Sequence, residues 1–168
     1  IYAAIHWPLP NNHVGYSVLS GFLNFLGNSA ISLRGISYLC ALCNLILLYV
    51  ISRKHFAKGF SLLAVFLYSC LNLVNQLAVQ GRGYTLAVTC HLVAVLMLHY
   101  ICLSHKQNDK KKIIYYVIFS LSLTLGLYTL PSSVYWVIPI CLIGGFFLLM
   151  KKEWVTLKKL FISSIVAA

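Results

Sequence analysis

Charge is scarce in this sequence, and acidic residues are almost absent. Only 9% of the 168 residues are charged, and only two of them are acids, against 13 lysines and arginines. The hydrophobic fraction is 61%, and the mean hydropathy is +0.88. A soluble domain needs a charged surface to face water. The composition therefore excludes a water-soluble enzyme.

The net charge of +11 is typical of a nucleic-acid-binding protein, but the positions of the basic residues favour a membrane instead. Eleven of the 13 lie in three short runs: Arg53, Lys54 and Lys58; Lys106, Lys110, Lys111 and Lys112; and Lys151, Lys152, Lys158 and Lys159. Long apolar stretches separate these runs. The pattern predicts an integral, multi-pass membrane protein with cytoplasmic basic loops, whose partner is the lipid bilayer and not a nucleic acid.

Five apolar segments are long enough to cross a hydrocarbon core, which takes about 20 residues of helix. We predict spanning helices over 31–51, 60–79, 84–103, 113–130 and 134–150, and the start of a truncated sixth over 160–168. Two segments separate each pair of successive basic runs, so all three runs fall on one face. The expected fold class is all-α, a polytopic transmembrane helix bundle. Residues 1–168 would form a single domain, as a fragment of a longer polypeptide.

The opening stretch, 1–28, is expected to lie outside the bilayer as an external loop followed by an interfacial helix. From Val14 to Leu26, apolar residues recur at helical spacing, and a polar stripe on another face includes Ser17, Ser20 and Asn24. A helix of about 13 residues is too short to cross and suits the membrane interface, with its apolar side toward the lipid.

All six cysteines lie within or at the ends of apolar segments: Cys40, Cys43, Cys70, Cys90, Cys102 and Cys141. A zinc site would need further ligands at the same depth, and the sequence offers none, so we interpret the cysteines as small packing residues. No metal site and no certain cofactor is predicted, and a need for a divalent metal stays open. Most polar residues at bilayer depth, among them Asn44 and His91, are expected to form hydrogen bonds between helices.

Two arginines lie apart from the basic runs, on the face expected to be external. Arg34 precedes Arg53 by 19 residues, or about 28 Å of helix, which places it near the outer interface. Arg82 lies between two glycines, where the backbone is free to turn tightly beside a fixed guanidinium. Such a turn can bind an anion such as a phosphate, although an arginine at a helix end is more often an interfacial anchor.

Four short elements resemble a known family. They are Asn11 to Ser17, which includes His13; Leu33 with Arg34; Gln80 to Thr85, which reads Gln-Gly-Arg-Gly-Tyr-Thr; and Leu127 to Thr129. In order and spacing they resemble elements of the GT-C superfamily of membrane glycosyltransferases, most of all its family 39-type branch of protein mannosyltransferase-like and aminoarabinose transferase-like enzymes.

The resemblance implies an enzyme that transfers a sugar from a polyprenyl-phosphate-linked donor to an acceptor hydroxyl on the external or lumenal face. The acceptor would be a glycan, a lipid or a protein. Residues expected to bind the lipid phosphate or the substrate are Arg82, His13, Arg34 and Tyr84, with Tyr84 as an orienting hydroxyl. The membrane would be the bacterial inner membrane, or the endoplasmic reticulum in a eukaryote.

The family's chemistry also requires a carboxylate to take the proton of the acceptor. The resemblance places that residue in the first external loop, upstream of Ile1, so the catalytic base is unknown. The chain's only acids, Asp109 and Glu153, lie in the basic loops.

Two other classes stay open on the sequence alone. In part of a secondary transporter or lipid flippase, the polar residues within the membrane would line a pathway. A scaffold subunit without catalytic activity would have no dedicated pocket.

Overall fold

The computed structural model describes residues 13–103 and 109–167, and the expected external loop over 1–12 lies outside them. Every regular element in the described ranges is helical, which confirms the predicted all-α fold class. The elements are α2 (Val14–Leu23), η1 (Asn24–Leu26), α3 (Ser29–Arg53), α4 (Lys58–Cys70), α5 (Asn72–Val79), α6 (Tyr84–Leu103), α7 (Asp109–Thr129), η2 (Pro131–Ser133), α8 (Val134–Met150) and α9 (Trp154–Ala167).

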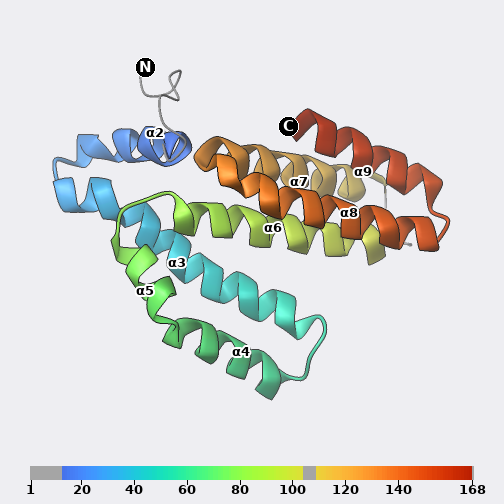
Figure 1. The fold of residues 1–168 in the computed structure, drawn as a ribbon, viewed down its shortest axis with the longest axis horizontal. Helices are drawn as coiled ribbons and strands as arrows, with labels where there is room; N and C mark the ends of the chain where they lie inside the picture. Colours follow the sequence, from blue (N-terminus) through green and yellow to red (C-terminus); the bar gives the residue numbers. More distant parts are fainter. Residues whose placement is uncertain (1–12, 104–108, 168) are drawn as a thin grey trace.

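Helix α6 is the centre of the bundle. It packs on α7, α3 and α8, and helices α4 and α5 lie beside α3, on the side away from α7, α8 and α9 (Figure 1). Its most apolar 18-residue window is 44% buried, against 22% for the corresponding windows of α3 and of the stretch Pro131–Met150. These three are the helices in the described ranges that are long and apolar enough to cross a membrane unaided.

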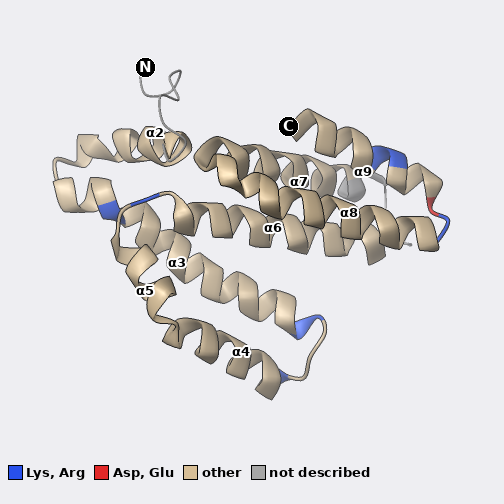
Figure 2. Cartoon of the chain, viewed as in Figure 1, with Lys and Arg blue, Asp and Glu red and all other residues tan. Residues whose placement is uncertain are grey.

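The basic residues divide the bundle into two ends. Figure 2 shows basic segments at the α3–α4 and α8–α9 connections, which we call the lysine end. At the opposite end, which we call the arginine end, Arg34 at the start of α3 lies near Arg82 in the turn before α6. The start of α2 and the end of α7 also lie at the arginine end.

The segment 60–79, which we predicted as one spanning helix, is broken. Helices α4 and α5 meet at an angle of 63°, because Leu71 has an extended backbone with φ −68° and ψ 117°. The break frees backbone carbonyls, and the Asn75 side-chain amide donates a hydrogen bond to one of them, that of Ser69, at 3.0 Å. Polar side chains that satisfy freed carbonyls make such breaks tolerable within a membrane. The pair is either a broken span or a re-entrant loop.

The remaining helix bounds lie within four residues of the expected ones, except at the last helix. Helices α6 and α8 have the bounds 84–103 and 134–150 expected from the sequence. Helix α9 begins at Trp154, six residues before the expected start at 160. Lys158 and Lys159 therefore lie within a helix. Their long side chains can extend from it toward the interface.

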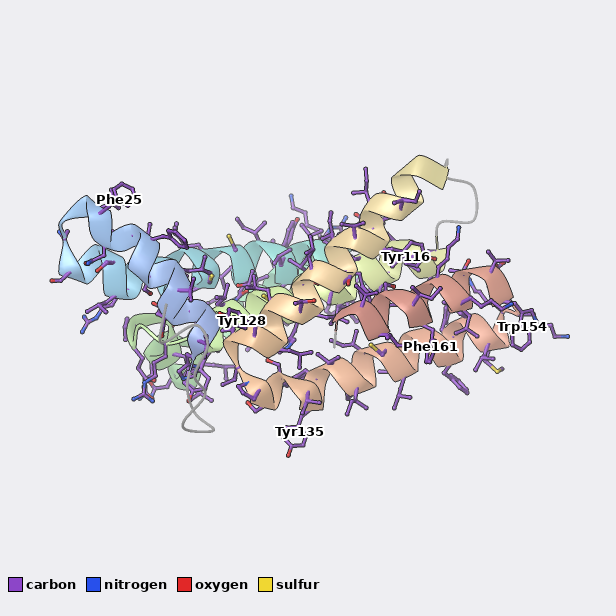
Figure 3. The ribbon with its side chains drawn as sticks, turned by 90° about the horizontal axis from the view of Figure 1, so that it is seen from above. Phe25, Tyr116, Tyr128, Tyr135, Trp154 and Phe161 are labelled. Atoms are coloured by element: carbon purple, nitrogen blue, oxygen red, sulfur yellow. The ribbon has the colours of Figure 1, made fainter. Side chains whose placement is uncertain are left out.

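The stretch from 14 to 26 is helical, as α2 followed by η1, and its two faces have different surroundings. Ser17, Ser20 and Asn24 line a cleft against α3, and Phe22 and Phe25 are 70% and 81% exposed. Figure 3 shows Phe25 pointing away from the bundle. An exposed apolar face on a short helix is what an interfacial helix presents to lipid.

Helix α3 is polar where it is buried and apolar where it is exposed. Its buried residues are Ser32, Ser37, Asn44 and Ser52, whereas Leu39, Leu42 and Ile46 are each about 60% exposed. The Asn44 side-chain amide donates to the Thr85 carbonyl of α6 at 3.2 Å. This confirms the expected hydrogen bond between helices for Asn44, and small polar residues at helix contacts are typical of membrane proteins.

His91 differs from Asn44. Its Nε2 atom is buried and has no hydrogen-bond partner among the described residues, and its ring stacks on Trp136 with 6.1 Å between centroids. The ring is therefore held by contact with an aromatic side chain.

Large exposed aromatic side chains lie at both ends of the bundle. Figure 3 shows Tyr135 projecting outward from the start of α8 and Trp154 at the lysine end. Their exposed fractions are 77% and 58%. Tyr and Trp are enriched where a protein crosses the two membrane interfaces, so these positions fit interfacial anchors.

Candidate functional site

Three segments that are distant in the sequence meet at Gly83, at the arginine end. A Cβ atom built on Gly83 would lie 2.6 Å from Cγ2 of Thr129 and 3.1 Å from Nδ1 of His13. Neither distance leaves room for a side chain. The start of α2, the turn before α6 and the end of α7 are therefore in direct contact here, and only glycine allows that approach.

The turn that carries Arg82 is fixed against α3 by its backbone. Gly81 has a φ of +63°, and a Cβ atom at this position would lie 2.5 Å from the carbonyl oxygen of Leu33. The Ser37 hydroxyl lies 3.2 Å from the Arg82 carbonyl oxygen, which shares the single hydroxyl hydrogen with a second acceptor described below. The backbone of Arg82 is thus held in place, and its side chain remains exposed.

A buried tyrosine connects α2 to the same part of α3. The Tyr16 hydroxyl donates to the Leu33 carbonyl at 2.6 Å and accepts from the Ser37 hydroxyl at 2.9 Å. Since the Ser37 hydroxyl hydrogen is shared between the Tyr16 oxygen and the Arg82 carbonyl, one chain of polar contacts joins α2, α3 and the turn. We call this chain, formed by Tyr16, Ser37 and the Leu33 and Arg82 carbonyls, the hydroxyl network.

His13 lies edge-on to Tyr84, with 4.6 Å between ring centroids and an interplanar angle of 72°. Both ring nitrogens of His13 and the hydroxyl of Thr129 are buried and have no hydrogen-bond partner among the described residues. Buried polar atoms are nearly always paired in folded proteins. A polar group that enters between α2, the turn and α7 would meet these three atoms.

The charge state of His13 follows from its surroundings. Burial, and to a smaller extent the positive charge of Arg82, lower the pKa of His13 below its ordinary value. The imidazole is therefore neutral at pH 7, and it offers one N–H donor and one acceptor nitrogen.

Arg34 lies next to the Arg82 turn. Its Cγ atom is 3.4 Å from the position that a Cβ atom of Gly81 would occupy, and its side chain, like that of Arg82, is exposed. Beside them, α2 and α3 enclose a cleft of about 380 Å³, whose lining residues are Tyr16, Ser17, Ser20, Gly21, Asn24, Ser32, Leu33 and Gly81. Two cations and a polar cleft thus share one end of the bundle.

The four site residues expected from the sequence all lie at this end: His13, Arg34, Arg82 and Tyr84. Sequence reasoning missed the parts played by Tyr16, Ser37 and Thr129. Tyr16 and Thr129 lie in the motifs quoted above, but the motifs did not reveal their contacts. Ser37 is an ordinary serine in an apolar helix, and no pattern distinguishes it.

The two acids of the chain lie far from these residues. Asp109 begins α7, whose other end, Thr129, contacts Gly83; that helix of 21 residues is about 31 Å long. Glu153 lies in the α8–α9 connection, at the lysine end. Neither of the two acidic residues of the sequence therefore belongs to an element end near His13. Within the described ranges there is also no group of three or more His, Cys, Asp or Glu side chains that could hold a metal ion.

The structure is an apolar helix bundle, with exposed leucines around polar helix contacts and a basic, polar site at one end. These features define an integral membrane protein with a candidate anion site. The particular family follows from comparison with known proteins. Residues 13–168 match the family of dolichyl-phosphate-mannose-protein mannosyltransferases, and the chain belongs to this family, which is of the GT-C type. It is thus related to mannosyltransferase-type glycosyltransferases, and the transporter alternative is not favoured. No curated protein matches the chain. No solved structure matches it either.

Proposed function

We propose that this protein takes part in the transfer of a sugar of the mannose type from a polyprenyl-phosphate carrier to an acceptor hydroxyl, and that the arginine end binds the carrier's phosphate. The observation that carries the proposal is the convergence of His13, Arg34 and Arg82 on one end through separate elements. Membership of the mannosyltransferase family supports the reaction class.

The chemistry of the leaving group explains the choice of residues. When the sugar leaves, negative charge develops on the phosphate, and donors fixed in advance stabilise it best. The exposed guanidinium of Arg82 extends from a backbone held by the Gly81 contact and by Ser37, so it is fixed at its base. A guanidinium can bind a phosphate with two parallel hydrogen bonds.

The other residues have complementary roles. Arg34 supplies a second positive charge beside the turn. Neutral His13 donates a hydrogen bond without adding charge, and Tyr84, which lies against its ring, orients it. We expect the proton of the acceptor to be taken by a carboxylate outside these 168 residues, because Asp109 begins α7 at the end opposite Thr129 and Glu153 lies at the lysine end.

The direction of insertion belongs to the same proposal. Basic residues in short loops favour the cytoplasmic side, so the lysine end faces the cytoplasm and the arginine end faces the exterior or the lumen. Transfer would then use an acceptor on that outer side, and the acceptor is a glycan, a lipid or a protein.

The test compares Arg82, in the turn before α6, with Arg53, at the lysine end of α3. The full-length protein is reconstituted in liposomes with polyprenyl-phosphate-mannose, and transfer to an acceptor is measured for Arg82→Ala and for Arg53→Ala. Arg53 is an exposed arginine at the lysine end, so its replacement removes the same charge. Loss of a fixed donor to developing charge lowers rates by about 100-fold or more. We expect that loss for Arg82→Ala and a change of less than about twofold for Arg53→Ala.

Inhibition by the product separates phosphate binding from a general loss of structure. Free polyprenyl phosphate should inhibit the wild-type protein and the Arg53→Ala variant equally, and it should inhibit any residual activity of Arg82→Ala more weakly. Undiminished transfer by Arg82→Ala, or unchanged product inhibition, would reject the assignment of the phosphate site.

A further inference from the structure

An apolar groove lies between α6 and α8 at the lysine end, on the opposite end of the bundle from the candidate phosphate site. Its volume is about 290 Å³, and its lining residues are His55, Val95, Leu98, His99, Cys102, Leu103, Ile143, Gly144 and Phe147. Apart from the two histidines, the lining is apolar. The groove therefore suits a hydrocarbon chain.

Positive charge and aromatic rings border this groove on the side of α6. The Lys54 ammonium lies 4.8 Å from the centroid of the Tyr100 ring, and Tyr100 stacks on Tyr115 of α7 with 5.2 Å between centroids. The rings of His55 and His99 are 5.1 Å apart and edge-on. A cation held over an aromatic face keeps a defined position. The α3–α4 connection thus supplies a fixed cation beside the two lining histidines.

A second cation borders the groove on the side of α8. The Lys151 ammonium lies 4.5 Å from the centroid of the Phe147 ring, and Phe147 is itself a lining residue. The groove consequently has an ammonium group near each of its two walls, at the end of the helices where the interface begins. An occupant must combine an apolar chain with an anionic group.

We propose that this groove binds one anionic phospholipid, with an acyl chain between α6 and α8 and the headgroup phosphate between Lys54 and Lys151. A free phosphate would leave the apolar walls uncovered, and a lipid without net charge would gain no attraction from the two ammonium groups. Clustered basic side chains next to membrane helices are a recurrent feature of anionic lipid sites. The proposal requires only that the leaflet at the lysine end contains such lipid.

The site is separate from the candidate phosphate site. Helix α6 runs from Tyr84 at the arginine end to Leu103 in the groove, and its 20 residues span about 30 Å. Failure of the proposed transferase activity would therefore leave this inference intact, and the reverse is also true.

The test uses a photoactivatable phosphatidylglycerol at low mole fraction in nanodiscs of phosphatidylcholine, with the full-length protein. Peptide mass spectrometry locates the cross-links. The site variant Lys54→Gln with Lys151→Gln is compared with Lys58→Gln with Lys152→Gln, which removes the same charge from the start of α4 and from the α8–α9 connection. Each basic side chain near an anionic headgroup contributes about fivefold in affinity. We expect cross-linking in 95–103 and 143–147 to fall more than about tenfold in the site variant and less than about threefold in its control.

A second pair of variants tests the apolar part. Ile143 lines the groove and is 67% exposed, whereas its neighbour Leu142 is 66% exposed and does not line it. Ile143→Trp should fill the groove and reduce cross-linking, and Leu142→Trp should not. Equal losses in both lysine variants, cross-links spread evenly around the bundle, or competition by inorganic phosphate as strong as competition by phosphatidylglycerol would overturn the proposal.

Discussion

Replacing Tyr16 by Phe tests whether the hydroxyl network holds the arginine end together. The substitution keeps the ring, which is 4% exposed, and removes one oxygen atom. That oxygen donates to the Leu33 carbonyl at 2.6 Å and accepts from Ser37 at 2.9 Å. The change therefore removes two hydrogen bonds and creates no large cavity.

The expected cost follows from these two bonds. Each contributes about 0.5–1.5 kcal/mol to the free energy of unfolding, so their combined loss is about 2 kcal/mol. For a chain of this length, 1 kcal/mol corresponds to about 2–4 °C in the midpoint of thermal unfolding. Tyr16→Phe should therefore lower the midpoint by about 4–8 °C.

The matched control is Tyr38→Phe. Tyr38 lies next to Ser37 on α3, is 49% exposed and is not part of the hydroxyl network. Thermal unfolding of the two variants, measured in one detergent, should show the fall for Tyr16→Phe and a change of less than about 2 °C for Tyr38→Phe. Ser37→Ala completes a double-mutant cycle with Tyr16→Phe. The double variant should lose at least about 0.5 kcal/mol less than the sum of the single losses, because the two hydroxyls share a bond.

Two results would refute this reasoning. If Tyr16→Phe unfolds at the same temperature as the wild-type protein, the hydroxyl does not fix α2 to α3. If the losses of Tyr16→Phe and Ser37→Ala are simply additive, the two side chains act independently, and no network joins α2 to the Arg82 turn.

Two further predictions concern the contact at Gly83. Gly83→Ala should destabilise the fold by about 1–3 kcal/mol, because a methyl group would overlap Thr129; Gly21→Ala, where nothing lies within 4 Å, should be neutral or stabilising in the same unfolding assay. Arg82→Ala should raise the pKa of His13 toward about 6.5 without reaching it, since burial, the larger cause, remains. Titration of the imidazole carbons by NMR measures this, and an unchanged pKa would contradict it. The unfolded chain binds more protons at His13 than the folded chain does. His13 should therefore lower the free energy of unfolding as the pH falls below about 6.5.

The sequence predicts the helices well where hydropathy alone determines them. The bounds of α6 follow from a long uncharged, mainly apolar run between Arg82 and the basic run that begins at Lys106. It does not predict the break at Leu71, because leucine is a good helix former and the polar residues that permit the break act through a side-chain bond from Asn75 to Ser69. That bond depends on backbone geometry, which composition does not record.

Only part of the candidate site could be predicted from the sequence, and the reason is similar. The topology places the starts of α2 and α3 and the Arg82 turn at one end, which is enough to group His13, Arg34 and Arg82. The side chains that fix those elements could not be found, since Ser37 is a short polar residue like many others in membrane helices. Its importance comes from lying opposite Tyr16, and that pairing spans 21 residues of sequence.

The polar interior of α3 has a consequence for how this protein tolerates change. In a water-soluble domain, buried leucines are the positions that resist substitution and surface serines vary freely. Here the order is reversed: Ser37 and Asn44 occupy the crowded contacts, and residues such as Leu39 and Ile46 face outward. A random mutational survey should accordingly find that exchanges among the exposed aliphatic side chains of α3 are harmless. Replacement of a buried serine by alanine should be damaging.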